Sequence, residues 1–263
     1  MPTTEFTCVA SVNALEWLTQ NRQQAVRTIT DLPGLTACSQ LITLANGERY
    51  VLRTQSQRAT DYGVNYQQEA QLLRHIAPLG ISPTPIYTDE NASLLAWIDG
   101  EVPTAFRPDL LRKLAETMAR LHATSLQGVR SLPKSAKFDL AERCQFLWDK
   151  LSPEKQHALP FSPPFPQITP FRQALCHHDV HLGNLVEQGD RLFLIDWEYA
   201  AISDPALDLT LFLHANRLSE GDQQLFLKSY FAKSRDFSPP CCLAKMAQYQ
   251  KAVAKLNELW YAI

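Results

Sequence analysis

The chain has 263 residues, of which 45% are hydrophobic, and its formal net charge at pH 7 is −2. This length is enough for one large domain or two lobes, and the near-neutral charge argues against a nucleic-acid-binding protein, which needs a basic surface. No apolar stretch approaches the roughly eighteen residues that cross a membrane. The N-terminal segment 1–10 lacks the charged and apolar regions of a secretory signal, so a cytoplasmic protein without membrane contact is expected.

The six cysteines are scattered along the chain. Cys241 and Cys242 are adjacent, and no pair has the Cys-x-x-Cys spacing of a metal or redox motif. We therefore expect all of the cysteines to be reduced thiols, which is their usual state in the cytosol.

The N-terminal part of the chain carries strand and hairpin signals. Asn46-Gly47 is a strong two-residue turn signal between two apolar runs, and it predicts a β-hairpin. Pro83 and Pro85 restrict their segment to an extended or edge conformation, because proline cannot donate to a sheet. The elements predicted in this part are a helix over 11–25, the hairpin over 39–53, a helix over 60–77, an edge segment over 81–87 and a strand over 93–98.

The rest of the chain has mainly helical patterns. Asp204-Pro205 marks a helix start, because a capping residue is followed by proline at the first helical position. The segment 160–170 contains five prolines and can form neither a helix nor a central strand. The helices predicted in this part cover 108–124, 138–151, 206–217, 219–233 and 239–262.

One stretch, 176–199, concentrates polar side chains around a predicted hairpin. Its two apolar runs are separated by the turn signal around Gly189. Asn184 begins the first run and Asp196 follows the second, so the hairpin is expected to bring the oxygen atoms of these two side chains together. Such hard oxygen ligands suit Mg²⁺. Asp179, five residues before Asn184, remains as a carboxylate without an obvious metal role.

The spacing His177-x-Asp179-x4-Asn184, with Asp196 twelve residues later, resembles the catalytic loop and the metal-binding aspartate of protein-kinase-like phosphotransferases. The loop carries an extra His181 and Gly183, and this form resembles the branch that contains aminoglycoside phosphotransferases and choline kinases. The continuation 195–200 is most similar to choline, ethanolamine and thiamine kinases, and Asp-Pro-x-x-Asp-Leu follows at 204–209.

The resemblance implies an α+β, bilobal protein-kinase-like fold. A small antiparallel β-sheet lobe over 1–100 would bind the nucleotide, and a larger, mainly helical lobe over 101–263 would carry catalysis and substrate binding. The resemblance also implies ATP as co-substrate and Mg²⁺ as cofactor. In this interpretation Asn184 and Asp196 hold Mg²⁺ against the ATP phosphates, and Asp179 orients the acceptor hydroxyl.

Four further residues are expected to support the catalytic loop. His177 would pack and hydrogen-bond locally rather than transfer protons, and the same is expected of His178 and His181. Asp208, in Asp-Pro-x-x-Asp-Leu, matches a family aspartate that braces the loop through backbone N–H groups.

On the nucleotide side, the resemblance assigns phosphate binding to Arg53, which replaces the usual kinase lysine and departs from the protein-kinase pattern. Arginine stays charged and can hold phosphate through two N–H groups. Glu69 would form an ion pair with it. Ser39, in a loop with Gly34 as its single glycine, would offer its hydroxyl to phosphate; the alternative is an ordinary hairpin lead-in.

The segment 93–101 resembles the strand and hinge that hold adenine. Ala96 and Ile98 would contribute backbone groups, and Trp97 or Leu95 would line the purine. The alternative is a core strand.

The acceptor site is expected next to the metal aspartate, at Trp197, Glu198 and Tyr199. Aromatic faces with a carboxylate suit a quaternary ammonium or thiazolium cation, and further aromatics stand at positions 249, 260 and 261. The alternative is that these aromatics form core.

The expected function is an ATP- and Mg²⁺-dependent small-molecule kinase whose partners are ATP and an alcohol such as thiamine, choline or ethanolamine. The first alternative is an aminoglycoside or sugar phosphotransferase. An alternative of another class is a catalytically inactive, kinase-like nucleotide-binding protein. The sparse glycine loop and Arg53 would suit that protein, but the intact Asp179, Asn184 and Asp196 argue against it.

Overall fold

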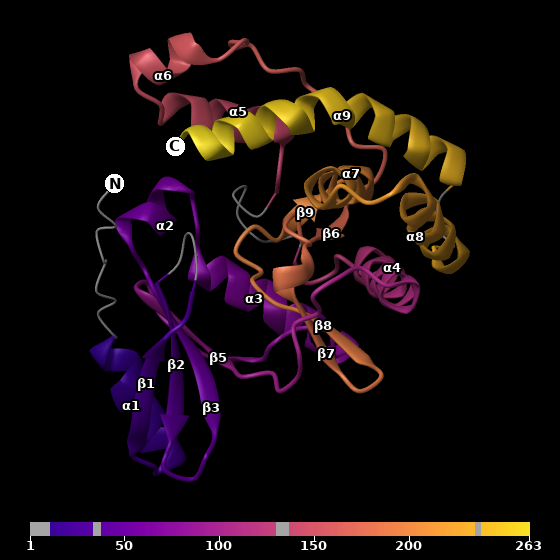
Figure 1. The fold of residues 1–263 in the computed structure, drawn as a ribbon. Coiled ribbons are helices and arrows are strands. Elements are labelled where there is room, and N and C mark those ends of the chain that lie inside the picture. The colour runs from indigo at the N-terminus through magenta and orange to yellow at the C-terminus, as the bar shows by residue number, and fades with distance from the viewer. Residues whose placement is uncertain (1–10, 34–37, 130–136, 235–237) are drawn as a thin grey trace. The chain divides into compact units, whose positions relative to one another are not determined.

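The computed structural model describes residues 11–33, 38–129, 137–234 and 238–263 (Figure 1). The chain divides into two compact units. The first comprises Met1–Ala77 and Ser82–Asp99, and the second comprises Pro78–Ile81 and Gly100–Ile263.

The first unit is built on a five-stranded antiparallel sheet with the strand order β1-β2-β3-β5-β4. The predicted hairpin is formed by β2 and β3, and Gly47 in its turn has a φ of 89°, which glycine tolerates best. The proline-containing segment forms the edge strand β4, as predicted, whereas β1 was not foreseen. The strands are β1 Val26–Asp31, β2 Cys38–Leu44, β3 Arg49–Thr54, β4 Pro85–Thr88 and β5 Ala92–Ala96.

Three helices accompany this sheet: α1 Val12–Arg22, α2 Gln57–Asp61 and α3 Tyr66–Ile76. Helix α1 buries Ala14 and Leu18 against apolar side chains of the sheet. The single helix predicted over 60–77 is in fact two helices. Gly63 has a φ of 71°, and the Asn65 side chain accepts a hydrogen bond from the backbone N–H of Gln68 to cap α3, so the chain turns between them.

The second unit is mainly helical, with two small sheets. Strand β6 pairs with β9, and β7 pairs with β8 in the predicted hairpin. The strands are β6 Ala174–Cys176, β7 Leu185–Gln188, β8 Arg191–Leu194 and β9 Ala201–Ser203. The helices are α4 Pro108–His122, α5 Leu140–Asp149, α6 Pro153–Ala158, α7 Pro205–Asn216, α8 Glu220–Lys233 and α9 Pro239–Ala262. The short helix α6 was not predicted, and the proline-rich segment 160–170 forms neither helix nor strand.

Helix α7 lies at the centre of this unit and is buried from Pro205 to Phe212. It contacts α9, which also contacts α5, while α4 contacts α8 (Figure 1). A helix that is buried on all sides is mostly apolar, and α7 departs from this in its buried stretch at Asp208 and at Thr210, whose hydroxyl donates to the Ala206 carbonyl. Among the described residues, no helix is both long enough and apolar enough to span a lipid bilayer.

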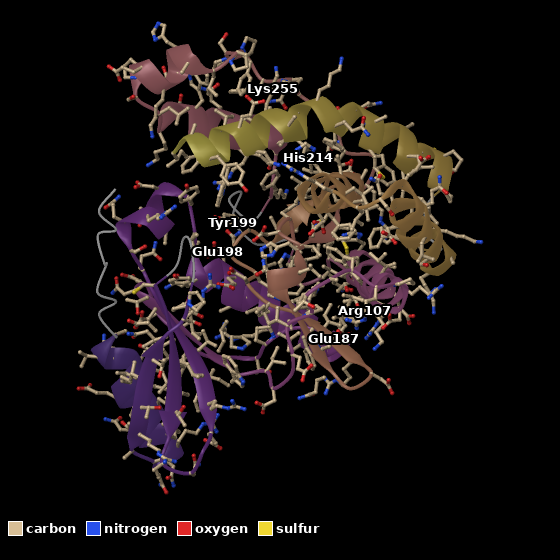
Figure 2. The ribbon with its side chains drawn as sticks, viewed as in Figure 1. Arg107, Glu187, Glu198, Tyr199, His214 and Lys255 are labelled. Carbon is tan, nitrogen blue, oxygen red and sulfur yellow. The ribbon has the colours of Figure 1, made fainter. Side chains whose placement is uncertain are left out.

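The segment that enters the second unit is fastened to β7. Glu101 and Glu187 exchange two backbone hydrogen bonds of 2.9 and 2.8 Å, and Arg107 donates to both carboxylate oxygens of Glu187 (Figure 2). Gly100 lies so close to β7 that an added Cβ would stand 2.4 Å from the Glu187 carbonyl oxygen. Glycine is therefore required here by close approach.

The prediction that all cysteines are reduced thiols is wrong for Cys38, which is disulfide-bonded. The other described cysteines are free. Spacing along the chain does not reveal such a bond, because a disulfide depends on Cα atoms that the fold brings within about 7 Å.

Candidate active site

The loop that begins after β6 is held in place by Asp208 at the start of α7. The backbone N–H of His178 donates to Oδ1 of Asp208 at 2.8 Å, and that of His177 donates to Oδ2 at 3.0 Å. His178 has a φ of 67°, an uncommon conformation for a residue other than glycine. Its Nδ1 lies 2.9 Å from the carbonyl oxygen of Tyr199, which holds the ring in place.

His177 connects the loop to the end of β8. Its Nε2 lies 3.0 Å from the carbonyl oxygen of Ile195, so Nε2 is the donor. Its Nδ1 then accepts from the backbone N–H of Asp179 at 3.3 Å. Burial lowers the pKa of His177, so the ring stays neutral. Both nitrogens are used structurally, which leaves no role for His177 in proton transfer.

Asp179 is held as a carboxylate whose second oxygen contacts Asn184. The amide nitrogen Nδ2 of Asn184 donates to the Asp179 backbone oxygen at 2.9 Å and to Oδ2 at 3.0 Å. Nε2 of His181 lies 3.7 Å from the same carboxylate oxygen. Burial acts to raise the pKa of Asp179, but the hydrogen bonding and positive charge of His181 outweigh it, and the pKa is lowered. The pKa of His181 is raised by the same contact.

The β7–β8 hairpin brings Asn184 and Asp196 together. Leu185 pairs with Leu194, and the Ile195 N–H donates to the Asn184 carbonyl at 3.0 Å, so Asp196 is the next residue after that pair. Because Nδ2 of Asn184 is committed to Asp179, its amide oxygen is the atom left to bind a cation. An amide oxygen beside a carboxylate matches the ligands that Mg²⁺ prefers, so these two residues fit that ion. Asp196 has a φ of 60°, a strained conformation typical of functional positions.

In the first unit, Arg53 and Glu69 form a buried ion pair. Nη1 of Arg53 donates to Oε1 of Glu69 at 2.6 Å, and both side chains are at least 96% buried. The Tyr66 ring lies 5.2 Å from the guanidinium carbon. Ser39 is the cross-strand partner of Arg53 in the β2–β3 pair, so both lie at one level of the sheet. The predicted phosphate loop around Gly34 lies outside the described residues.

The predicted hinge follows β5. The backbone N–H groups of Ala96 and Trp97 donate to the carbonyl oxygens of Thr84 and Arg49, at 2.8 and 3.1 Å. Neither N–H group is therefore available to a nucleotide base. The Trp97 ring stacks under the guanidinium of Arg49, with 5.4 Å between the guanidinium carbon and the ring centre.

The model of the phosphotransferase enzyme family (APH) matches residues 39–243. The chain belongs to this family. It is 25% identical over 185 residues to the LicA homolog of Metamycoplasma hominis, covering 67% of this chain and 69% of that protein. It is 29% identical over 168 residues to thiamine kinase from Escherichia coli, covering 62% of this chain and 57% of that kinase.

Among solved structures, the chain is similar to choline kinase LicA from Streptococcus pneumoniae, with a TM-score of 0.68 and 17% identity over 95% of this chain and 91% of that one. This likeness confirms the predicted α+β, protein-kinase-like fold. The chain is a phosphotransferase of the small-molecule kinase type.

The aromatic residues predicted to bind the acceptor separate into core and non-core groups in this phosphotransferase. Trp197 is fully buried, its Nε1 donates to the Leu194 carbonyl at 2.7 Å, and its ring lies against His177. Trp197 therefore has no surface to offer to an acceptor, and this prediction is not retained. Tyr249 is also core, since it is 2% exposed and its hydroxyl donates to Asp204 at 3.0 Å. The sequence does not distinguish an aromatic residue that packs in the core from one that binds an acceptor, because both can stand next to a functional aspartate.

Glu198 and Tyr199 remain on the segment after Asp196 (Figure 2). Glu198 is 9% exposed and Tyr199 is half-buried. The guanidinium carbon of Arg143 lies 5.6 Å from the centre of the Tyr199 ring. Burial raises the pKa of the Tyr199 hydroxyl, so it stays protonated at neutral pH.

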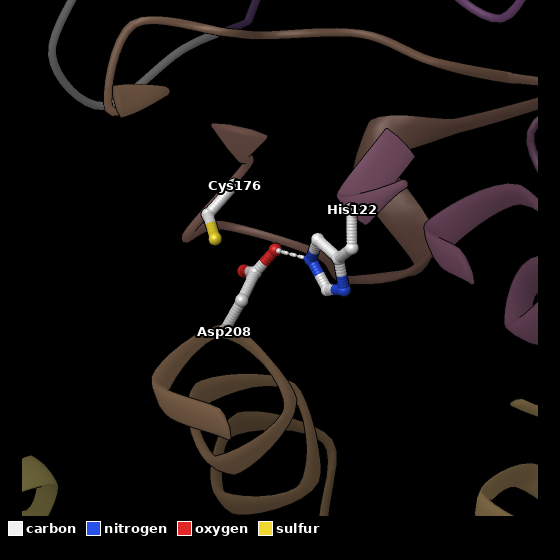
Figure 3. A group of neighbouring side chains, drawn as sticks. All are labelled: His122, Cys176 and Asp208. Carbon is white, nitrogen blue, oxygen red and sulfur yellow. Dashed lines mark hydrogen bonds and ion pairs between the residues drawn. The ribbon is translucent and has the colours of Figure 1, made fainter. Parts of the chain in front are cut away.

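Sequence reasoning missed one residue of the site, His122 at the end of α4. Its Nε2 lies 2.9 Å from Oδ2 of Asp208, the oxygen that also accepts from the loop (Figure 3). The two residues are 86 positions apart, and no spacing rule connects them. The sequence shows that the helix ends in Leu121-His122, but it does not indicate which residue His122 contacts.

Proposed function

We propose that this phosphotransferase is an ATP- and Mg²⁺-dependent kinase that phosphorylates the hydroxyl of a small cationic alcohol of the thiamine, choline or ethanolamine type. The observation that carries this proposal is the arrangement of Asp179, Asn184 and Asp196. The Asp179 carboxylate is kept ionised and accepts a hydrogen bond from the Asn184 amide, and Ile195, the neighbour of Asp196, donates its backbone N–H to the Asn184 carbonyl across the β7–β8 hairpin.

Asn184 and Asp196 would hold Mg²⁺ through the amide oxygen and the carboxylate. The ion would neutralise charge on the transferring phosphoryl group. Asp179 would accept a hydrogen bond from the acceptor hydroxyl, orient it and take its proton as the hydroxyl oxygen bonds to the γ-phosphorus and the bond from that phosphorus to the leaving ADP breaks. Its lowered pKa supports this role, because the group is ionised at neutral pH.

Arg53 would bind ATP phosphate from the first unit. The Arg53–Glu69 ion pair fixes the direction of the guanidinium, and the Ser39 hydroxyl would add a donor at the same level of the sheet. The N–H groups of Ala96 and Trp97 already donate to backbone carbonyls of the protein. Adenine would therefore bind to the N–H of Ile98 and to backbone carbonyl oxygens of this segment. Trp97 would contribute its ring.

Glu198 and Tyr199 would meet the cationic part of the acceptor, since a carboxylate and an aromatic face both attract an ammonium or thiazolium group. The relatives named thiamine kinase and choline kinase support acceptors of this class. Trp197 supports the site from within the core and is left out of the acceptor contacts.

A panel of alcohols tests the proposal: thiamine, choline, ethanolamine, methylthioribose, homoserine and kanamycin, each with Mg-ATP. ADP release by a coupled assay and the new phosphomonoester by ³¹P NMR are the two readouts. We expect turnover of at least one cationic small alcohol, and none in the Asp179→Ala control. Turnover of kanamycin alone would assign the chain to antibiotic phosphorylation, and no turnover with any acceptor would favour an inactive nucleotide-binding protein.

A further inference from the structure

Three buried side chains from three helices form a hydrogen-bonded chain that ends at the catalytic loop. Tyr230 of α8, His122 of α4 and Asp208 of α7, here called the buried triad, are each at most 1% exposed. Nδ1 of His122 lies 2.7 Å from the Tyr230 hydroxyl. Nε2 of His122 lies 2.9 Å from Oδ2 of Asp208, the contact drawn in Figure 3.

The direction of each hydrogen bond follows from the charge of Asp208. Burial acts to raise the pKa of Asp208, but hydrogen bonds, first that from His122 and also that from the His177 N–H, act against it, and the pKa is lowered. An ionised carboxylate only accepts, so Nε2 of His122 is the donor. A tautomer with its proton on Nε2 has a lone pair on Nδ1, which can accept from the Tyr230 hydroxyl 2.7 Å away. Tyr230 thereby selects the tautomer that His122 needs.

Asp208 joins this triad to the loop. Its Oδ1 accepts from the His178 N–H, and its Oδ2 accepts from both the His177 N–H and His122. His178 immediately precedes Asp179. The rotation of the Asp208 side chain therefore sets where the loop begins, and His122 is the side chain that restrains that rotation.

The same region resembles a metal site, because ligand atoms of His122, Cys176 and Asp208 lie within 4.8 Å of one another. Two observations oppose that interpretation. Both nitrogens of His122 already have partners, and the Asp208 oxygens receive two backbone N–H groups. Burial also raises the pKa of the Cys176 thiol, and its Sγ lies 3.7 Å from the Ala174 carbonyl as a weak donor.

We propose that His122 is a positioning residue for phosphoryl transfer, that Tyr230 holds it in the Nε2–H tautomer, and that together they orient Asp208 and so the loop that carries Asp179. This inference rests on the phosphotransferase activity of the family and not on the identity of the acceptor.

Three variants test it. His122→Leu removes the donor to Asp208, His122→Gln keeps a side-chain N–H donor, and Tyr230→Phe removes one oxygen while keeping the ring. Met118→Leu, one turn earlier on α4 and also fully buried, is the matched packing control. A volume-conserving change of this kind is usually tolerated in a buried position.

For turnover, we expect kcat to fall about 10- to 100-fold in His122→Leu, the range seen when an outer partner of a functional group is lost. The KM for ATP should stay within about twofold, and His122→Gln should recover most of the rate. Wild-type kcat in a folded His122→Leu protein would overturn the proposal. The proposal would also be overturned if His122→Gln and His122→Leu lost kcat equally and this loss followed only the fall in melting temperature.

Two measurements need no acceptor. In ¹⁵N-histidine NMR, His122 should give the Nε2–H pattern in the wild type and a mixed pattern in Tyr230→Phe. Amide exchange over 177–184 should be about tenfold faster in His122→Leu than in Met118→Leu, as expected for a loop that opens locally. An unchanged tautomer in Tyr230→Phe would overturn the role of Tyr230. Stabilisation of the wild type by Zn²⁺, absent in His122→Leu, would show a metal site instead.

Discussion

Replacing Asp179 by asparagine isolates the charge of the proposed catalytic group from its shape. The Asn184 amide donates to Oδ2 of Asp179 at 3.0 Å and to its backbone oxygen at 2.9 Å. An asparagine at position 179 keeps one side-chain oxygen that can accept from the Asn184 amide. The hydrogen bond from that amide to the backbone oxygen of residue 179 is unaffected, so the loop should retain its geometry. What is lost is the negative charge and the second acceptor oxygen, which becomes an NH₂ donor and cannot take a proton from a hydroxyl.

General-base groups contribute about 10²- to 10⁴-fold to rate, which corresponds to roughly 3–5 kcal/mol of transition-state stabilisation. We therefore expect Asp179→Asn to lower kcat within that range, with the KM for ATP almost unchanged because the proposed contact is with the acceptor. Steady-state kinetics and a melting curve on one preparation give both numbers. Full kcat in a stable Asp179→Asn protein would refute the catalytic role. Equal losses of rate, ATP affinity and melting temperature would show that Asp179 only holds the loop together.

The pH dependence of the same variant follows from the lowered pKa of Asp179. A folded-state pKa below the unfolded value, about 3.9 for aspartate, means that the ionised group contributes stability above that pH. The contribution is lost as the pH falls through the lowered value. The stability difference between wild type and Asp179→Asn should therefore be largest near neutral pH and should shrink on acidification below the unfolded pKa. A difference that grows on acidification would contradict the lowered pKa.

Three further tests have expected outcomes. Asp196→Ala should abolish Mg-ATP turnover in a folded protein and Asn184→Ala should only weaken its Mg²⁺ dependence; wild-type turnover of Asp196→Ala at ordinary Mg²⁺ would contradict the metal assignment. Arg53→Ala leaves a buried carboxylate without its 2.6 Å partner and should cost about 3–5 kcal/mol in urea unfolding; an unchanged midpoint would show that the pair is not buried in solution. Gly100→Ala places Cβ 2.4 Å from a β7 carbonyl and should cost about 1–3 kcal/mol, whereas Gly221→Ala, which has open space in α8, should not destabilise; equal melting temperatures for the two variants would refute the close approach.

The parts of the site that were predictable from sequence depend on short-range geometry. A turn at Gly189 between two apolar runs is enough to expect that Asn184 and Asp196 lie side by side, since a hairpin pairs residues at fixed offsets. The Arg53–Glu69 ion pair was expected because the resemblance supplied the strand and the helix that carry the two residues.

The parts that sequence did not reveal depend on packing between distant segments. Strand β1 is an exposed edge strand, so it has no alternating apolar pattern to recognise. His122 and Asp208, which contact each other, lie on different helices and are 86 positions apart in the sequence. Burial of Trp197 was undecidable because an aromatic residue suits a core and a binding site equally.

The burial of Trp197 is explained by the conformation of the neighbouring backbone. Asp196 has a φ of 60° and His178 has a φ of 67°, conformations that cost of order 1–3 kcal/mol and persist only where neighbouring contacts hold them. At His178 those contacts are its N–H bond to Asp208 and its ring bond to the Tyr199 carbonyl. At Asp196 the adjacent indole of Trp197 bonds to the Leu194 carbonyl and packs on His177, which in turn bonds to the Ile195 carbonyl. A tryptophan used in this way has to be buried, because water would compete for the hydrogen bond that fixes the strained turn.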